Sequence, residues 1–119
     1  MIGGTGTISS AITRQLAAAG HDLWLLNRGN RKNEVPEGVT QIIADIDDEP
    51  KVLELLGKKT FDTVCEFIGF LPSQVERDVR LFKGRTRQYV YISSASAYNK
   101  PAANHVITEG TTLANPYWE

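Results

Sequence analysis

Apolar residues in the first third of the chain follow two spacings, one typical of a helix and one typical of a buried strand. Over residues 9–19 the apolar positions recur every three or four residues, which predicts an amphipathic helix ended by Gly20. The apolar face of that helix is expected to consist of Ile8, Ile12, Leu16 and Ala19. Residues 23–26 form an almost unbroken apolar run and residues 39–44 a weaker one, as expected for strands buried on both faces. Residues 27–38 are polar and contain glycine, so we expect a loop there.

The same two spacings continue through the middle of the chain. Pro50 suits the first turn of a short helix that ends at Gly57. Residues 61–68 and 88–92 are rich in β-formers and predict two further strands. Between these strands, residues 73–76 have the spacing of a capping box, which predicts the start of another helix. The apolar stripe expected along that helix is Val75, Val79 and Phe82.

Strands and helices that alternate in this way are typical of a parallel sheet covered by helices on both faces. The expected fold class is therefore α/β, and a chain of 119 residues fits one domain, residues 1–119. From Tyr98 onward the periodicity fades into a stretch with two prolines, for which we expect an ordered loop over the domain.

Charge and composition narrow the classes of partner. Thirteen basic and fourteen acidic residues leave a formal charge of −1, which gives no support to binding of nucleic acid or of an acidic membrane surface. Cys65 is the single cysteine, so no disulfide forms within the chain. No pair or cluster of Cys and His has metal-ligand spacing in the sequence. No apolar run is long enough to span a bilayer. We expect a cytoplasmic protein that acts on a small molecule.

A glycine-rich segment stands at the very start of the chain and leads into the first helix. Gly4-Thr5-Gly6-Thr7-Ile8-Ser9 matches the dinucleotide fingerprint G-x-G-x-x-G except at its last position. Glycines allow a tight turn and a close approach of the backbone to a diphosphate, and the helix start stabilises the anion. At Ser9 the helix either sits farther from the sheet or is capped by the hydroxyl. An ordinary glycine-rich turn is the alternative.

A polar cluster follows the strand at 23–26. It contains Arg28, with Arg31 and Lys32 close behind, and no acidic residue. In NAD-binding sheets this strand end carries an acidic residue for the ribose hydroxyls, whereas an arginine suits the 2′-phosphate of NADP. Arg28 is therefore our candidate for a phosphate contact, with a solvated surface arginine as the alternative. Asp45, after the next strand, is a candidate acceptor for the adenine amino group or a turn residue.

These motifs together resemble the NAD-dependent epimerase/dehydratase family, the extended short-chain dehydrogenase/reductases. The resemblance is carried by Ile2-Gly3-Gly4-Thr5-Gly6-Thr7-Ile8-Ser9, by Ala44-Asp45 and by Tyr91-Ile92-Ser93-Ser94-Ala95-Ser96-Ala97-Tyr98. It extends over essentially the whole chain, and a bacterial branch of the family also has Leu26-Asn27-Arg28-Gly29 and Asn115-Pro116-Tyr117-Trp118. The resemblance implies a Rossmann-type doubly wound sheet that binds a nicotinamide dinucleotide and oxidises or reduces a carbon of a sugar nucleotide or similar substrate.

Site residues follow from the resemblance position by position. The residues expected to contact the cofactor are Gly3, Gly6, Thr7, Ile8, Arg28, Asp45, Ile46, Phe67, Ile68 and Gly69. Ser94 matches the catalytic Ser/Thr of the family, whose hydroxyl bonds the reacting substrate oxygen; the alternative is a strand-end serine that satisfies a turn.

Two parts of the family pattern are missing from the chain. No Tyr-x-x-x-Lys pair is present, although family catalysis needs its phenol for proton transfer and its lysine to lower the phenol pKa. Only Met1 and Ile2 precede the glycine loop, where a complete first strand is expected. We therefore expect a partial dinucleotide-binding domain of a longer enzyme, without most of the first strand and the C-terminal part, and inactive by itself.

Two functions remain open from the sequence. The first is the cofactor-binding part of an epimerase, dehydratase or reductase that uses NADP or NAD, with NADP favoured, and that takes a sugar nucleotide or similar substrate. The second is a non-catalytic relative that senses a dinucleotide or binds RNA or another partner, the RNA version being poorly supported by the charge. A homodimer is compatible with both.

Overall fold

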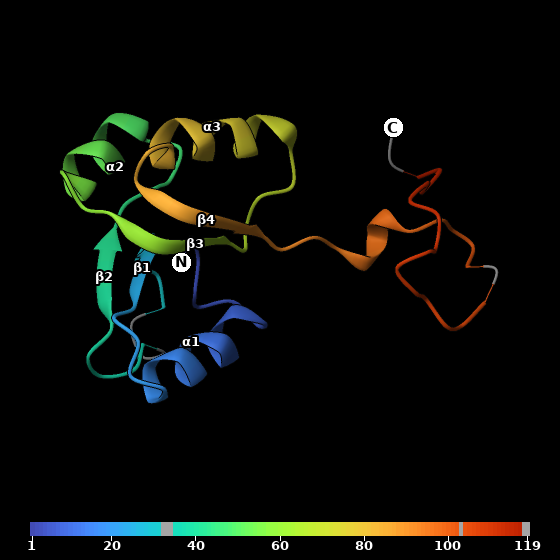
Figure 1. Cartoon of the computed structure of the whole chain (residues 1–119), viewed down its shortest axis with the longest axis horizontal. Coiled ribbons are helices and arrows are strands. Elements are labelled where there is room, and N and C mark those ends of the chain that lie inside the picture. The colour runs from blue at the N-terminus through green and yellow to red at the C-terminus, as the bar shows by residue number, and fades with distance from the viewer. Residues whose placement is uncertain (32–34, 103, 118–119) are drawn as a thin grey trace.

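The computed structural model describes residues 1–31, 35–102 and 104–117. Helices and strands alternate along it, as Figure 1 shows. In chain order they are α1 (Ser9–Ala18), β1 (Trp24–Asn27), β2 (Thr40–Ile43), α2 (Glu49–Leu56), β3 (Phe61–Glu66), α3 (Pro72–Phe82), β4 (Thr86–Tyr91) and a 3-10 turn (Ala95–Ala97). Each expected helix and strand is present, with ends that differ by one or two residues from the expectation.

The strands are parallel and form two pairs joined through the start of the chain. β1 pairs with β2, and β3 pairs with β4. Ile2 forms parallel bridges to Leu26 of β1 and to Glu66 of β3, so it occupies the central position between the two pairs. Its amide donates to the Cys65 carbonyl at 2.8 Å, and the amide of Gly3 donates to the Leu26 carbonyl at 2.9 Å. The resulting order, β2, β1, the Ile2 segment, β3, β4, is that of a Rossmann-type doubly wound sheet.

Helices cover both faces of this sheet (Figure 1). α1 lies on one face, and α2 and α3 lie on the other. The main core forms between the sheet and the α2–α3 face, and its buried members are Ile2, Leu26, Ile42, Ile46, Val52, Leu56, Val64, Leu81 and Phe82. Leu25 is fully buried and, as a strand neighbour of Leu26, points to the opposite face, toward the glycine loop.

The buried face of α1 differs from the expected apolar stripe. Ile8 is 65% exposed, and the residues of α1 that are buried are Ser9 and Thr13. The Thr13 hydroxyl donates to the Gly4 carbonyl at 2.8 Å, so its polar group is satisfied inside the fold. The predicted stripe is wrong at Ile8 and Ala19, which are exposed, whereas Ile12 and Leu16 are half-buried. Thr13 takes the most buried position because a hydroxyl bonded to the loop backbone is buried as readily as an apolar group.

The start and the buried face of α3 also differ from the expectation. The helix begins at Pro72, and the side-chain oxygen of Gln74 accepts hydrogen bonds from the amides of Phe70 and Leu71 at 2.6 and 2.9 Å. The predicted capping box at 73–76 is therefore wrong in register. Val79 is 52% exposed, and the buried residues of α3 are Arg77, Asp78, Leu81 and Phe82. Ion pairs, described below, allow the two charged residues to be buried.

The segment after β4 runs away from the α/β body instead of lying over it as expected (Figure 1). The Ile92 amide still donates to the Glu66 carbonyl at 3.0 Å, but the hydrogen bonds found among the described residues from 93 onward join residues of the same segment, such as the Asn99 amide to the Thr112 carbonyl at 2.9 Å. Trp118, part of the motif 115–118, and Lys32 of the polar cluster lie outside the described residues.

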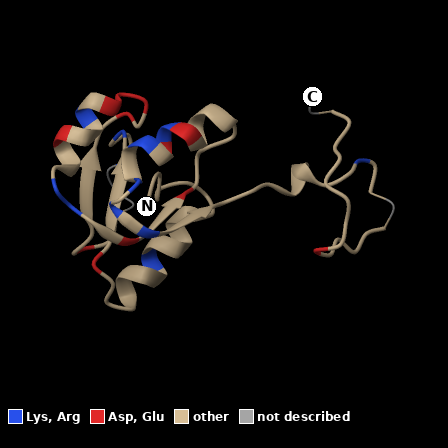
Figure 2. Ribbon diagram, turned by 45° about the horizontal axis from the view of Figure 1, so that its top comes forward, with Lys and Arg blue, Asp and Glu red and all other residues tan. Residues whose placement is uncertain are grey.

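Charges of both signs are mixed on the surface of the body. In Figure 2, basic and acidic residues stand next to one another along α2 and α3. This distribution agrees with the formal charge of −1.

Candidate functional site

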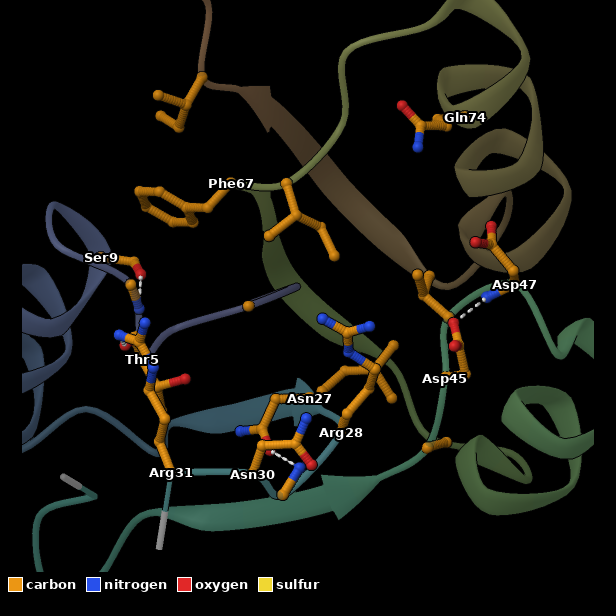
Figure 3. Close-up of a pocket in the computed structure, with 18 of the residues that line it drawn as sticks. Thr5, Ser9, Asn27, Arg28, Asn30, Arg31, Asp45, Asp47, Phe67 and Gln74 are labelled. Carbon is orange, nitrogen blue, oxygen red and sulfur yellow. Dashed lines mark hydrogen bonds between the residues drawn. The ribbon is translucent and has the colours of Figure 1, made fainter. Parts of the chain in front are cut away.

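A cavity of about 750 Å³ lies at the carboxyl ends of the parallel strands (Figure 3). This is the edge at which doubly wound sheets bind their ligands. Its walls are the glycine loop (Gly3 and 5–9), the end of β1 (26–31), the end of β2 (44–47), the turn after β3 (67 and 68), and Gln74, Arg77 and Ile92. Segments that are far apart in the sequence thus form one concave surface.

The glycine loop packs so tightly on the sheet that a side chain would not fit. Gly4 has φ +99°, and a Cβ there would lie 2.6 Å from a methyl carbon of Leu25. Gly3 has φ +95°, and its Cβ would lie 3.2 Å from Ile68. Both positions need glycine because L-residues rarely adopt these angles and because neighbouring side chains occupy the space.

Ser9 occupies the position at which the dinucleotide fingerprint has its third glycine. Its hydroxyl oxygen accepts a hydrogen bond from the Gly6 amide at 2.9 Å, and the residue is buried. It is not the N-cap of α1, which is Ile8. The serine therefore fastens the loop to the first turn of the helix instead of capping the helix.

Two amides at the start of α1 remain available to a ligand. Within the described part of the chain, no hydrogen-bond acceptor is found for the amides of Thr7 and Ile8, and the first turn carries no acidic residue. The start of a helix carries a partial positive charge, so both amides and the dipole favour an anion at this point of the cavity.

Arginines form one rim of the cavity. The Asn27 side chain accepts from the Gly29 amide at 2.8 Å, and Gly29 has φ +71°, so the chain turns sharply after β1. Arg28, on this turn, is exposed and lines the cavity, and no ion pair of the described residues includes it. Arg31 reaches across to the glycine loop, where its guanidinium donates to the Thr5 carbonyl at 2.7 Å (Figure 3).

The turn after β2 forms the next wall. Asp45 is exposed and lines the cavity, and one of its carboxylate oxygens accepts from the Asp47 amide at 3.1 Å. This is the turn role that the sequence left open, and it leaves the second oxygen of Asp45 without a bond within the described residues. Ile46 is buried, so it contributes to the core as well as to the cavity wall.

The turn after β3 is held by a buried carboxylate that the sequence analysis missed. One oxygen of Glu66 accepts from the Ile68 amide and, at 2.9 Å, from the Gly69 amide. Phe67 and Ile68 line the cavity, whereas Gly69 is buried behind it. This arrangement also explains why β3 ends at Glu66 and not at residue 68, since the two amides turn toward the carboxylate and leave the ladder.

Glu66 belongs to a buried charged cluster, which consists of Glu66, Arg77, Asp78 and Tyr89. The Arg77 guanidinium donates to Asp78 at 2.8 and 3.0 Å and to the second oxygen of Glu66 at 3.3 Å. The Tyr89 hydroxyl donates to Asp78 at 2.7 Å. Burial, with the neighbouring Asp78 carboxylate as a further cause, raises the pKa of Glu66 to about 7, although the bonded Ile68 amide acts against the rise. Burial and Asp78 also raise the pKa of the Tyr89 phenol.

Ser94 does not reach the cavity. It is exposed, and its hydroxyl oxygen accepts from the Ser96 amide at 3.1 Å as the cap of the 3-10 turn. Ile92, two residues earlier, is the last residue of the chain among the cavity walls. The structure thus brings nine of the expected cofactor residues to one cavity, namely Gly3, Gly6, Thr7, Ile8, Arg28, Asp45, Ile46, Phe67 and Ile68, and leaves out Gly69 and Ser94.

The described ranges contain neither a metal-binding cluster nor a membrane-spanning helix. No group of three or more His, Cys, Asp or Glu side chains in residues 1–31, 35–102 and 104–117 is arranged to hold a metal ion. Among the helices of the same ranges, none has the length and apolar character required to span a bilayer.

Comparisons with known proteins concern the family and the fold of the chain. The model of the NAD dependent epimerase/dehydratase family matches residues 1–118. Among solved structures, a UDP-glucose 4-epimerase superposes with a TM-score of 0.78 at 18% identity, over 97% of this chain and 40% of that chain. The Bifidobacterium longum UDP-glucose 4-epimerase in complex with NAD+ and UDP gives 0.71 at 21% identity, over 98% and 43%. The epimerase Mth375 of Methanothermobacter thermautotrophicus gives 0.74 at 17%, over 95% and 40%.

These structural likenesses, all below 25% identity, establish the fold. The chain spans less than half the length of each of these three solved relatives. A search of curated protein sequences returned no significant match.

Proposed function

The chain belongs to the NAD-dependent epimerase/dehydratase family, and on that basis we propose that its cavity binds a nicotinamide dinucleotide with the diphosphate at the start of α1. The observation that carries the proposal is the glycine loop. Its backbone lies directly on the sheet. The amides of Thr7 and Ile8 donate no hydrogen bond to any acceptor among the described residues. An anion such as a diphosphate satisfies both amides and is stabilised by the helix dipole.

The remaining contacts are proposed from the walls of the cavity. Gly3 and Gly6 permit the diphosphate to approach the backbone. Asp45 and Ile46 take the adenine, with the unbonded oxygen of Asp45 as acceptor for the adenine amino group. Phe67 and Ile68 line the path toward the nicotinamide, and Gly69 acts through the turn that positions them.

We further propose that NADP is preferred to NAD. Arg28 lines the cavity after β1, and no acidic residue competes for the ribose hydroxyls in the segment 27–31. The planar guanidinium offers paired donors that match a 2′-phosphate, which NAD lacks. Arg31 stands on the same rim and is occupied by the Thr5 carbonyl.

The cofactor preference is tested by calorimetric titration of the chain with NADP(H) and NAD(H). Hydrogen bonds between charged partners contribute about 1.5–3 kcal/mol, so Arg28→Met is expected to weaken NADP binding by at least about 10-fold and to leave NAD binding unchanged. Arg14→Met, which removes an exposed arginine of α1 that does not line the cavity, serves as the matched control. Tighter binding of NAD than of NADP by the unchanged chain would refute the role of Arg28.

The reaction of the whole enzyme is proposed from the family. A bound nicotinamide dinucleotide supplies hydride transfer, and the substrate is a sugar nucleotide or a similar compound with a hydroxyl or carbonyl group, as the name of the UDP-glucose 4-epimerase neighbours indicates for those proteins. Ser94 is proposed to polarise the substrate oxygen, which requires the segment after β4 to fold back toward Ile92 and the cavity. Because no Tyr-x-x-x-Lys pair stands in residues 1–119, this chain alone is expected to bind cofactor without turnover.

One observation favours a non-catalytic, dinucleotide-sensing relative as the second candidate. The Ser94 hydroxyl is bonded in a local turn and lies outside the cavity. The two candidates differ in a longer protein that contains this chain. There, Ser94→Ala slows turnover without changing dinucleotide affinity if the protein is an enzyme, whereas no turnover is found in any variant if it is a sensor.

A further inference from the structure

One guanidinium connects two walls of the cavity. Arg77 comes from α3, its side chain is 4% exposed, and it also lines the cavity. Its Nη1 donates to Asp47 at 2.6 Å, in the turn after β2, and its Nη2 donates to Glu66 at 3.3 Å, at the end of β3. These two turns follow different strands, and within the described residues no backbone hydrogen bond joins them directly.

Each end of this connection is fixed to residues that face the cavity. On one side, the Asp47 amide is bonded to the Asp45 carboxylate, so the ion pair holds the turn that carries Asp45 and Ile46. On the other side, Glu66 holds the amides of Ile68 and Gly69. A shift of the Arg77 head group therefore changes the spacing between the Asp45 wall and the Ile68 wall.

We propose that the Arg77–Asp47 ion pair positions the adenosine side of the cavity, so that Arg77 and Asp47 are positioning residues for the dinucleotide although neither needs to touch it. This inference rests on the proposed function. Asp48 offers a comparison within the same turn, because it is exposed and pairs with no described cation; its carboxylate caps α2 by accepting from the Lys51 amide at 3.2 Å.

The direction in which an Asp47 substitution changes the dinucleotide affinity distinguishes a positioning role from a simple charge effect. Removal of an acidic residue beside an anionic ligand strengthens binding through reduced repulsion. Loss of positioning weakens binding instead. The carboxylate of Asp47 is 71% exposed, so Asp47→Asn leaves the buried contacts of Arg77 with Glu66 and Asp78 in place, and the fold is expected to persist.

The experiment is a calorimetric titration of the chain and its variants with NADP(H) and with ADP. We expect Asp47→Asn to raise both dissociation constants about 5-fold, in the range of measured positional couplings. Asp48→Asn, with the same change of charge and with a side chain that still caps a helix, is expected to leave them unchanged or slightly lower. Asp47→Glu, which retains the charge, is expected to recover most of the lost affinity.

The outcomes separate this inference from the proposed function. If the unchanged chain binds neither NADP(H) nor ADP, the proposed function fails and the inference fails with it. If the unchanged chain binds both but Asp47→Asn and Asp48→Asn behave alike, the proposed function stands and the positioning role is refuted. A thermal midpoint that is the same in both Asn variants, together with weaker binding in Asp47→Asn alone, supports the positioning role.

Discussion

The buried carboxylate of Glu66 makes the stability of this fold depend on pH. Three carboxylates, those of Glu66, Asp78 and Asp47, surround the single guanidinium of Arg77, so one negative charge in the buried part of the cluster is poorly compensated. Glu66 is fully buried, and its pKa rises from 4.5 to about 7 in the folded chain. Burial is the main cause of this rise, and the nearby Asp78 carboxylate, which shares the Arg77 guanidinium with Glu66, is a further cause.

The sign of the effect follows from proton uptake. Between pH 4.5 and about 7 the folded chain binds a proton that the unfolded chain has released. The contribution of Glu66 to stability is therefore fully present below pH 4.5 and is lost as the pH rises through about 7. At about 1.4 kcal/mol for each tenfold change in proton affinity, the loss amounts to about 3 kcal/mol.

Glu66→Gln isolates this contribution. The glutamine has the same size, and its carbonyl oxygen accepts from the amides of Ile68 and Gly69, but it has no proton to release. Urea unfolding from pH 4.5 to pH 8 measures the free energy of unfolding of both proteins. We expect the unchanged chain to lose about 3 kcal/mol more than the variant over this interval.

A control and a clear contrary result complete this test. Glu76→Gln, the same change at an exposed position of α3, is expected to follow the unchanged chain at each pH. Parallel pH profiles for the unchanged chain and Glu66→Gln would show that folding does not raise the pKa of Glu66, and the account of the buried cluster would then be wrong.

Two further substitutions test the packing of the loop and the buried cluster. Gly4→Ala places a methyl group 2.6 Å from Leu25 at a positive φ, so we expect the free energy of unfolding to fall by about 3 kcal/mol in a urea titration. Gly20→Ala, also at positive φ but with nothing within 4 Å, is expected to lose only about 1 kcal/mol in the same titration. Equal losses in the two variants would contradict the close packing of Gly4 on Leu25. Tyr89→Phe removes the hydroxyl that donates to Asp78 at 2.7 Å. The free energy of unfolding is expected to fall by about 2 kcal/mol in the same titration. A fall below about 0.5 kcal/mol would show that water replaces the bond.

Much of the architecture could be predicted because its signals are local. The helix α2 has Pro50 in its first turn as expected, and Gly57 ends it with φ +54°. The glycine loop was recognised from its spacing, and its closeness to Leu25 explains why the glycines are required. Residues that follow parallel strands meet at one edge of the sheet, so Arg28 and Asp45 could be expected at one site, whereas Ile68 was expected there from the family resemblance; all three line the same cavity.

The polar interior could not be predicted from apolar periodicity. Thr13 is buried because its hydroxyl finds the Gly4 carbonyl, a partner that belongs to the loop and not to the helix pattern. Arg77 is buried because Asp47 and Glu66 supply carboxylates from two other strand ends, which only the folded chain brings together. One signal was available: an acidic residue, Glu66, interrupts an otherwise apolar run in residues 64–68.

The central claim is that the amides at the start of α1 hold the diphosphate of a nicotinamide dinucleotide. Its most direct test follows the backbone amide signals of the ¹⁵N-labelled chain by NMR during titration with NADP(H). We expect the largest and saturable shifts at Thr7 and Ile8, with smaller shifts at Arg28 and Ile68. Saturable binding that leaves the Thr7 and Ile8 signals in place, and moves signals elsewhere, would contradict the claim.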